Sequence, residues 1–203
     1  MRSIKLNNFY YKLFQKSKVL PFTLQNKILD SIDLTEFETD LVPFVKQYFY
    51  LNSGVEHYRL LAHISSYYNN ETLLDIGSYK GGSALALSFN KNNTVISIDI
   101  ENHLELSINR PNIEFKILNI LDHPNLIQQS KLIMLDTAHD GLFEKELYTY
   151  LTESNWNGII IADDIHLNKP MRKWWKSIEN KYKYDITKFG HHSGTGLINL
   201  LEK

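Results

Sequence analysis

From residue 72 onward, short apolar runs alternate with amphipathic stretches, which is the pattern of β-strands that alternate with helices in a parallel sheet. The runs with the length and composition of strands cover residues 72–76, 94–98, 113–118, 132–135, 159–162, 184–189 and 196–200. The last two flank a glycine-rich loop and are predicted to form a hairpin that closes the sheet. The others are separated by enough chain for one helix each.

Helical periodicity is visible around these runs. Phe143, Leu147 and Leu151 recur at a spacing of four residues, which predicts one buried helix face. Asn168 and Pro170 are residue types that begin helices. The apolar stripe that follows them comprises Met171, Trp174, Trp175, Ile178 and Tyr182. Residues 1–70 show a helical pattern, in which Leu60, Leu61, Ile64 and Tyr68 share one face.

The length of 203 residues suits one domain, or one domain with an extension. Because the strand pattern is preceded by helical sequence, we expect an N-terminal helical extension or cap over residues 1–54 and one α/β domain over residues 55–203. The 43% hydrophobic and 22% charged residues are ordinary for a soluble globular protein. No apolar run is long enough to predict a membrane span, and no secretion signal is recognisable. A cytoplasmic location is therefore the default expectation.

The charge and the cysteine content limit which nucleophiles, metal ligands and partners the protein can have. The absence of cysteine excludes thiolate nucleophiles, so any metal must be held by oxygen or imidazole. A net charge of −1 argues against a dedicated nucleic-acid-binding protein. Residues 1–20 and 168–188 are predominantly basic, whereas residues 90–165 are predominantly acidic. This distribution could hold a cation in the acidic centre and attract an anionic substrate or partner, or the charged runs could simply be solvated surface.

A glycine-rich turn follows the first predicted strand. Residues 75–83 read DIGSYKGGS, and glycines between a strand and a helix allow a ligand to approach the backbone and the helix N-terminus. Asp99 ends the second predicted strand and is placed to accept hydrogen bonds from ribose hydroxyls. The middle glycine of a dinucleotide fingerprint is replaced by Tyr79, whose side chain would crowd a pyrophosphate. These features predict a nucleoside site rather than a dinucleotide site.

The same residues resemble the first motif of class I S-adenosylmethionine-dependent methyltransferases, in particular the catechol O-methyltransferase-like branch. The resemblance covers roughly residues 55–200. It implies a Rossmann-like, seven-stranded, mostly parallel sheet with a reversed last strand and helices on both faces. It also implies S-adenosylmethionine as cofactor, bound by Asp75, Gly77, Ser78, Tyr79, Gly81, Ser83, Asp99, Asn119 and Asp136.

Carboxylates follow two further predicted strands, with Asp136 after residues 132–135 and Asp163 and Asp164 after residues 159–162. The carboxyl ends of parallel strands share one edge of a sheet, so these side chains should converge there. A hard divalent cation, Mg²⁺ first, would relieve their repulsion, although Asp163 could instead cap the following helix. The resemblance favours the cation, because metal-dependent O-methyltransferases have acids at these positions.

Histidines supply candidate bases. His139 lies three residues after Asp136, in the Asp-x-x-His pattern that resembles natural-product and sugar O-methyltransferases, where catechol enzymes have a lysine. Imidazole titrates near neutrality, so His139 could act as a general base. His166 is interpreted as a residue at a helix start. His191 and His192 could form a substrate rim, but solvation in the glycine-rich loop is favoured.

We therefore expect an S-adenosylmethionine-dependent O-methyltransferase that acts on a hydroxyl of a small molecule with the help of a divalent cation. One alternative is an NAD- or nucleotide-using enzyme on the same type of sheet. Another is a non-catalytic protein that keeps the cofactor fold as a scaffold. Homo-oligomer formation stays open, and so does the identity of the methyl acceptor, because acceptor pockets are built from variable loops.

Overall fold

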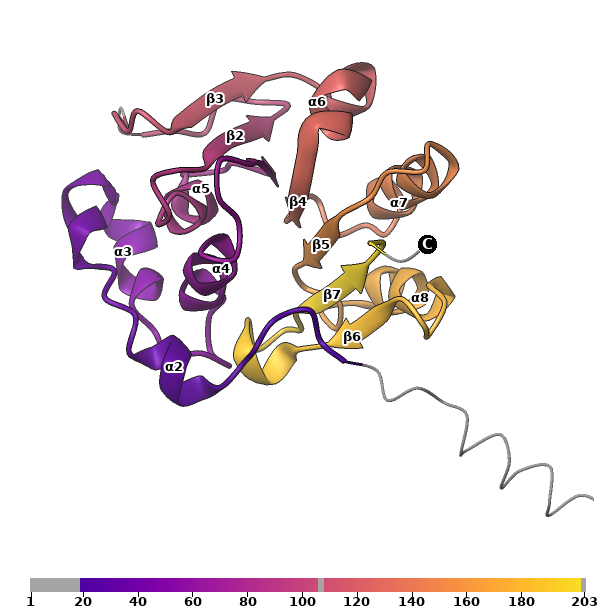
Figure 1. The fold of residues 1–203 in the computed structure, drawn as a ribbon, viewed down its shortest axis with the longest axis horizontal. Helices are drawn as coiled ribbons and strands as arrows, with labels where there is room; N and C mark the ends of the chain where they lie inside the picture. The colour runs from indigo at the N-terminus through magenta and orange to yellow at the C-terminus, as the bar shows by residue number, and fades with distance from the viewer. Residues whose placement is uncertain (1–18, 106–107, 202–203) are drawn as a thin grey trace, which may run out of the picture.

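The computed structural model describes residues 19–105 and 108–201, and it contains one seven-stranded sheet with helices on both sides (Figure 1). The strand order is β3-β2-β1-β4-β5-β7-β6. The strands are β1 (Thr72–Ile76), β2 (Thr94–Asp99), β3 (Ile113–Ile117), β4 (Ser130–Leu135), β5 (Ile159–Ala162), β6 (Lys183–Asp185) and β7 (Gly196–Asn199). β1 to β5 pair in parallel, whereas β7 is antiparallel to both β5 and β6. The expected fold, including its reversed last strand, is confirmed.

The two faces of the sheet are covered by different helices (Figure 1). The helices on the first face are α2 (Asn26–Asp30), α3 (Pro43–Phe49), α4 (Tyr58–Ser65) and α5 (Gly82–Leu87), with the 3₁₀ turn η1 (Thr35–Asp40) beside them. The second face carries α6 (Pro124–Gln129), α7 (Phe143–Glu153) and α8 (Lys169–Ser177). Neighbouring residues of a strand point to opposite faces, so Leu73 packs under the first group and Leu74 under the second.

The segment before β1 packs directly on the sheet. Phe37 of η1 and Phe49 of α3 are completely buried and belong to the same apolar cluster as Leu73 of β1. Arg110, which precedes β3, forms ion pairs with Glu36 and Asp40 of η1. Residues 1–18, which hold most of the N-terminal basic run, lie outside the described residues. In the part of the chain that is described, no helix has the length and apolar character needed to span a membrane.

The C-terminal hairpin has the predicted pairing but not the predicted length. β6 ends at Asp185, and the 3₁₀ turn η3 (Thr187–Phe189) replaces the rest of the predicted strand. Asp185 Oδ1 accepts hydrogen bonds from the backbone N–H and the hydroxyl of Thr187, at 3.1 and 2.6 Å, and this local contact turns the chain away from the sheet. Similarly, α8 ends at Ser177, so Tyr182 of the predicted stripe lies beyond the helix. The predicted Asn168 cap is present, because its side chain accepts a hydrogen bond from the Met171 N–H.

Candidate functional site

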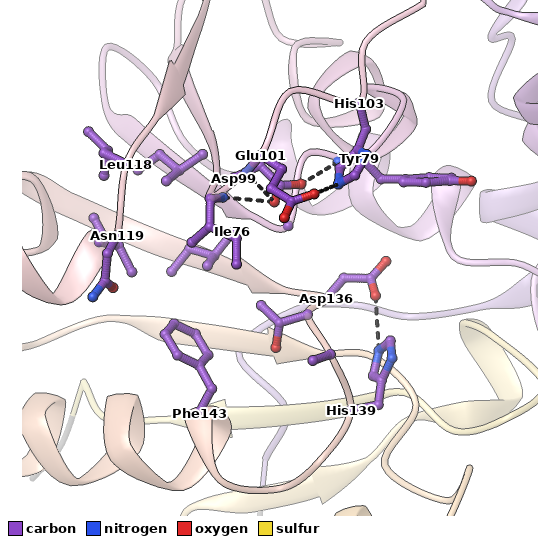
Figure 2. A pocket seen from close by; sticks show the side chains of 16 residues that line it. Ile76, Tyr79, Asp99, Glu101, His103, Leu118, Asn119, Asp136, His139 and Phe143 are labelled. Atoms are coloured by element: carbon purple, nitrogen blue, oxygen red, sulfur yellow. Dashed lines mark hydrogen bonds and ion pairs between the residues drawn. The ribbon is translucent and has the colours of Figure 1, made fainter.

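A cavity of about 620 Å³ lies at the carboxyl ends of β1, β2, β3 and β4 (Figure 2). Ile76 and Gly77 of the β1 end, Asp99 of the β2 end and Asn119 after β3 line it, together with the four residues 136–139 after β4. Figure 2 shows Asp99 and Tyr79 on the opposite side of this space from Asp136 and His139. In an open α/β sheet this edge is where ligands bind.

The turn after β1 depends on the lack of a side chain at Gly77. Its φ is +101°, and a Cβ atom there would lie 1.6 Å from the carbonyl oxygen of Asp136. The backbones that follow β1 and β4 therefore touch at the wall of the cavity. Tyr79 also has a positive φ of +41°, which is uncommon for a residue with a side chain. Its half-exposed ring packs against the rings of Phe44 and His103.

Asp99 is held in place by backbone donors. Its Oδ2 accepts a hydrogen bond of 2.9 Å from the N–H of Tyr79, and its Oδ1 accepts one of 2.8 Å from the N–H of Ile100. A carboxylate has about four acceptor sites, so Asp99 keeps capacity for hydroxyl donors in the cavity. Asn119 accepts a hydrogen bond from the Leu121 N–H at 3.2 Å, which fixes its side chain at the start of the turn η2 (Ile120–Asp122).

Asp75 lies behind the cavity wall rather than in it. The side chain is completely buried, its Oδ2 accepts a hydrogen bond of 2.7 Å from the Ser97 hydroxyl, and its Oδ1 has no hydrogen-bond partner. Burial raises the pKa of Asp75 to about 7, against the opposing effect of hydrogen bonds from Ser97 and Ser83. Ser78, Gly81 and Ser83 are also absent from the cavity lining, whereas Gly77, Tyr79, Asp99, Asn119 and Asp136 contribute to it.

Asp75 predicts a specific dependence of stability on pH. A buried carboxyl whose pKa is higher in the folded chain than in the unfolded chain costs stability as the pH rises from about 4 to about 7. Replacing Asp75 with asparagine removes this ionisation. The free energy of unfolding of Asp75→Asn, relative to the parent, should therefore increase by about 2 kcal/mol between pH 5 and pH 8 in urea titrations. Asp122→Asn, at an exposed acid, is the matched control, and parallel curves for Asp75→Asn and the parent would contradict the burial argument.

The three acids expected to bind a cation differ in their relation to the cavity. Asp136 lines it and is partly exposed, whereas Asp163 and Asp164 are buried. The N–H groups of Asp136 and Asp163 donate to the carbonyl groups of Ile76 and Leu135, both at 2.9 Å, so both acids continue the strand pairing. Asp164 adopts a positive φ of +58°, as does His139 at +55°. Such strained positions cluster at functional sites.

In the described part of the chain, the basic side chains that contact these three acids are histidines. His139 Nε2 lies 3.0 Å from Asp136 Oδ1 and 3.5 Å from Asp164 Oδ2. His57 Nδ1 lies 3.5 Å from Asp163 Oδ2, and His191 Nδ1 lies 3.2 Å from the same oxygen. We use the name acid–histidine cluster for Glu56, His57, Asp136, His139, Asp163, Asp164 and His191.

Glu56, His57 and His191 were not expected in the site. His57 is the N-cap residue of α4, and Glu56 precedes it, in a segment where the sequence shows only an amphipathic helix. The expectation of a solvated His191 is wrong, because its imidazole contacts the carboxylates of Asp163 and Asp164. His192 is exposed, and His166 lies before α8 and pairs with Asp185 at 2.8 Å. Apart from its position in a glycine-rich loop, nothing local in the sequence marks His191.

Charge within the acid–histidine cluster shifts several pKa values. Burial alone would lower the pKa of His57, but the carboxylates of Asp163 and Glu56 raise it to about 9. Burial likewise opposes the protonation of His191, whereas its contacts with Asp163 and Asp164 raise its pKa to about 10. The pKa of Asp163 is well below its usual range, since the attraction of His57 and His191 exceeds the effect of burial. The acids thus favour positive charge beside them.

The cluster fits a bound cation. Sets of ligand atoms that lie within 4.8 Å of one another come from His57, Asp136 and Asp163, from Asp163, Asp164 and His191, and from Glu56, His57 and His191. Buried atoms without a hydrogen-bond partner include Nδ1 of His57 and Oδ1 of Asp163. Each of these sets contains a histidine, and Asp136 and Asp164 do not occur together in any of them. The three aspartates expected from the sequence are divided between two of these sets, which share Asp163.

Comparison with known structures identifies proteins with the same fold. No protein-family model and no curated protein matches the sequence. A Staphylococcus aureus protein provisionally named caffeoyl-CoA O-methyltransferase superposes with a TM-score of 0.53 at 14% identity, over 96% of this chain and 99% of that one. Cofactor-bound Rv0187 from MTB gives 0.51 at 13% identity, over 84% and 88% of the chains. The SAH-bound Podospora anserina methyltransferase PaMTH1 gives 0.50 at 12% identity, over 98% and 96%.

The sheet order and the reversed last strand, together with these likenesses, define a Rossmann-like methyltransferase fold of class I. At identities of 12 to 14% the likeness extends to the fold and not to the substrate. The chemistry has to be inferred from the site itself.

Proposed function

We propose that this protein is an S-adenosylmethionine-dependent O-methyltransferase that acts on a hydroxyl of a small molecule with the help of a divalent cation. The observation that carries the proposal is one cavity with a ribose-type acceptor, Asp99, on one side and members of the acid–histidine cluster, Asp136 and His139, on the other. A cofactor that spans this cavity would have one end beside Asp99 and the other beside the cluster.

The first side of the cavity has the features of a nucleoside site. Asp99 is fixed by the N–H groups of Tyr79 and Ile100 and would accept hydrogen bonds from the two ribose hydroxyls. Gly77 lines the cavity where the methionine portion would lie, and its lack of a side chain lets the Asp136 backbone approach it. Asn119 and Leu118 would border the adenine, since both line the cavity beyond β3. When bound, S-adenosylmethionine supplies an electrophilic methyl group on a sulfonium.

The second side has the features of an acceptor site. A bound divalent cation would supply Lewis acidity that favours deprotonation of an acceptor hydroxyl, and its donors would come from the acid–histidine cluster. His139 would take the hydroxyl proton on Nδ1, because a neutral imidazole whose Nε2 faces the Asp136 carboxylate at 3.0 Å carries its hydrogen on Nε2. Asp136 in turn stabilises the imidazolium form, because it raises the pKa of His139 against the effect of burial. The Asn168 side chain donates a hydrogen bond of 2.7 Å to the His139 carbonyl and helps to hold this strained residue.

Ligand binding tests the proposal without knowledge of the acceptor. Calorimetric titration of the full chain with S-adenosylmethionine, with S-adenosylhomocysteine and with NAD should show binding of the first two only. Binding of NAD alone would favour the nucleotide-using alternative, since Tyr79 would then have moved away from a pyrophosphate. Failure to bind any of the three would favour a scaffold without catalysis.

Asp99 gives a sharper prediction for the same measurement. Asp99→Ala removes up to two charge-assisted hydrogen bonds to the ribose, each worth about 1.5–3 kcal/mol before water replaces part of the loss. Affinity for S-adenosylmethionine should therefore fall about tenfold or more. Asp99→Asn, which keeps one acceptor oxygen for the backbone donors, should show a smaller loss. Asp122→Ala changes an exposed acid outside the cavity and serves as the control. Parental affinity in Asp99→Ala, with an unchanged melting midpoint, would refute the ribose assignment.

A further inference from the structure

We propose that the cation of this site is a first-row transition metal held by His57, Asp136 and Asp163, rather than Mg²⁺ held by three aspartates. The inference rests on the proposed function only in assigning the cation to the same cavity. Ligand atoms of these three residues lie within 4.8 Å of one another. Asp136 also lines the cavity, so an ion in this set would be open to an acceptor oxygen on that side.

His57 is the residue that decides the ligand set. Its side chain is 5% exposed, and its Nδ1 atom makes no hydrogen bond, although Oε1 of Glu56 lies 3.1 Å from it and Oδ2 of Asp163 lies 3.5 Å from it. A buried imidazole nitrogen without a partner is costly unless another group satisfies it. Asp163, whose side chain is 4% exposed, has an unpartnered Oδ1 atom as well. A bound cation would satisfy both of these buried donor atoms, neither of which makes a hydrogen bond.

The other carboxylate oxygen of Asp163, Oδ2, also has a spacing that agrees with metal coordination, and it lies 3.2 Å from Nδ1 of His191 as well. His57 Nδ1 lies 3.5 Å from Asp163 Oδ2, and this separation is long for a hydrogen bond. Two ligand atoms about 2.1 Å from a tetrahedral metal ion are about 3.4 Å apart. The pair therefore has the separation of neighbouring ligands of one ion.

Asp164, the third aspartate expected from the sequence, is engaged elsewhere. Its Oδ1 accepts a hydrogen bond from the Ser193 hydroxyl and lies 3.3 Å from Nδ1 of His191. Its Oδ2 faces His139 at 3.5 Å. These contacts make Asp164 a positioning residue for His139 and for the loop of His191.

The donor set selects the class of metal. Mg²⁺ requires near-octahedral oxygen coordination and retains water, whereas imidazole suits Zn²⁺ and Fe²⁺, and Mn²⁺ accepts mixed oxygen and nitrogen donors. One imidazole with two carboxylates is such a mixed set. The alternative is that His57 is a buried, protonated partner of Asp163 and never binds a metal. Measurement of metal affinity in a His57 variant distinguishes a metal ligand from such a partner.

The experiment uses the full chain after removal of metals by a chelator, without cofactor or acceptor. Titrations with Mn²⁺, Zn²⁺ and Mg²⁺ should show that Zn²⁺ binds about 100-fold or more tightly than Mg²⁺. His57→Gln should weaken Mn²⁺ and Zn²⁺ binding by about tenfold or more while Mg²⁺ binding changes little. Asp164→Asn should change the Mn²⁺ and Zn²⁺ affinities less than His57→Gln does. His123→Gln, at an exposed histidine, is the matched control.

Spectroscopy identifies the ligand independently of affinity. Electron spin-echo measurements on the Mn²⁺-loaded protein should show coupling to nitrogen that is lost in His57→Gln and kept in His191→Gln. Coupling that is lost only in His191→Gln would overturn the proposal in favour of the set with Asp163 and Asp164. Equal affinity for Mg²⁺ and Zn²⁺, or no nitrogen coupling, would also overturn it. Circular dichroism melting of each variant separates these outcomes from misfolding, and binding of S-adenosylmethionine tests the proposed function separately.

Discussion

Replacing Gly77 with alanine should abolish measurable binding of S-adenosylmethionine and lower the free energy of unfolding by about 3 kcal/mol, because two unfavourable terms coincide at this residue. Its φ of +101° is strained for any residue with a side chain. Its Cβ would also lie 1.6 Å from the oxygen and 2.7 Å from the carbon of the Asp136 carbonyl group. Both atoms belong to the backbone, so no rotamer change can relieve the contact.

The clash between the new Cβ atom and the Asp136 carbonyl group would disturb both the cavity wall and the Asp136 side chain. Asp136 is tied to β1 by its N–H bond to the Ile76 carbonyl, so separation of the Gly77 and Asp136 backbones has to break or stretch that bond. The cavity wall and the carboxylate that faces His139 would move together. Calorimetry with S-adenosylmethionine and urea denaturation measure the two effects.

Gly81→Ala is the matched comparison. Gly81 has a similar φ of +83°, but its Cβ would meet the end of the Ile108 side chain, at 2.5 Å, which can change rotamer. It does not line the cavity. We expect Gly81→Ala to lose only about 1–2 kcal/mol of stability and to retain cofactor binding. Equal losses in the two variants would show that backbone strain alone, and not the approach to Asp136, sets the effect at Gly77.

Four of the five parallel strands were predictable from sequence because they are mostly apolar runs bounded by turn residues, whereas β3 alternates apolar and charged residues. β5 matches its prediction at both ends, and β1 does too. Strands covered by helices on both faces need apolar side chains at nearly every position, and such runs stand out. β6 lies at the edge of the sheet and has no buried residue, and its Asp185 makes the local turn that shortens it.

The candidate site was predictable only where residues follow strands. Asp99, Asp136 and Asp163 each come at or directly after a strand, and parallel strands bring their ends to one edge. His57 and His191 reach Asp163 from the start of α4 and from the loop before β7, which are far apart in sequence. No periodicity or motif encodes such a meeting, because it depends on how α4 packs against the sheet.

Replacing His139 with alanine should lower methyl transfer by about 10²–10⁴-fold while cofactor affinity stays near the parental value, because a positioned base contributes to turnover rather than to nucleoside binding. The imidazole faces Asp136 at 3.0 Å on the far side of the cavity from Asp99, so its loss leaves the ribose contacts in place. Transfer of radioactive methyl from S-adenosylmethionine to a panel of catechols, phenols and hexosides measures turnover.

Rescue of the His139→Ala variant by added imidazole distinguishes a general base from a residue that only packs. His139 is partly exposed, with 20% of its side chain accessible, so free imidazole can enter the space that His139→Ala creates. Added imidazole should restore part of the lost rate to His139→Ala and leave the parent and His123→Ala unchanged, since His123 is exposed and outside the cavity. His139→Gln fills the same space without a basic nitrogen, so it should stay slow and resist rescue. A His139→Gln protein with parental turnover would instead assign His139 to positioning Asp136, and the proton would then have to leave through solvent.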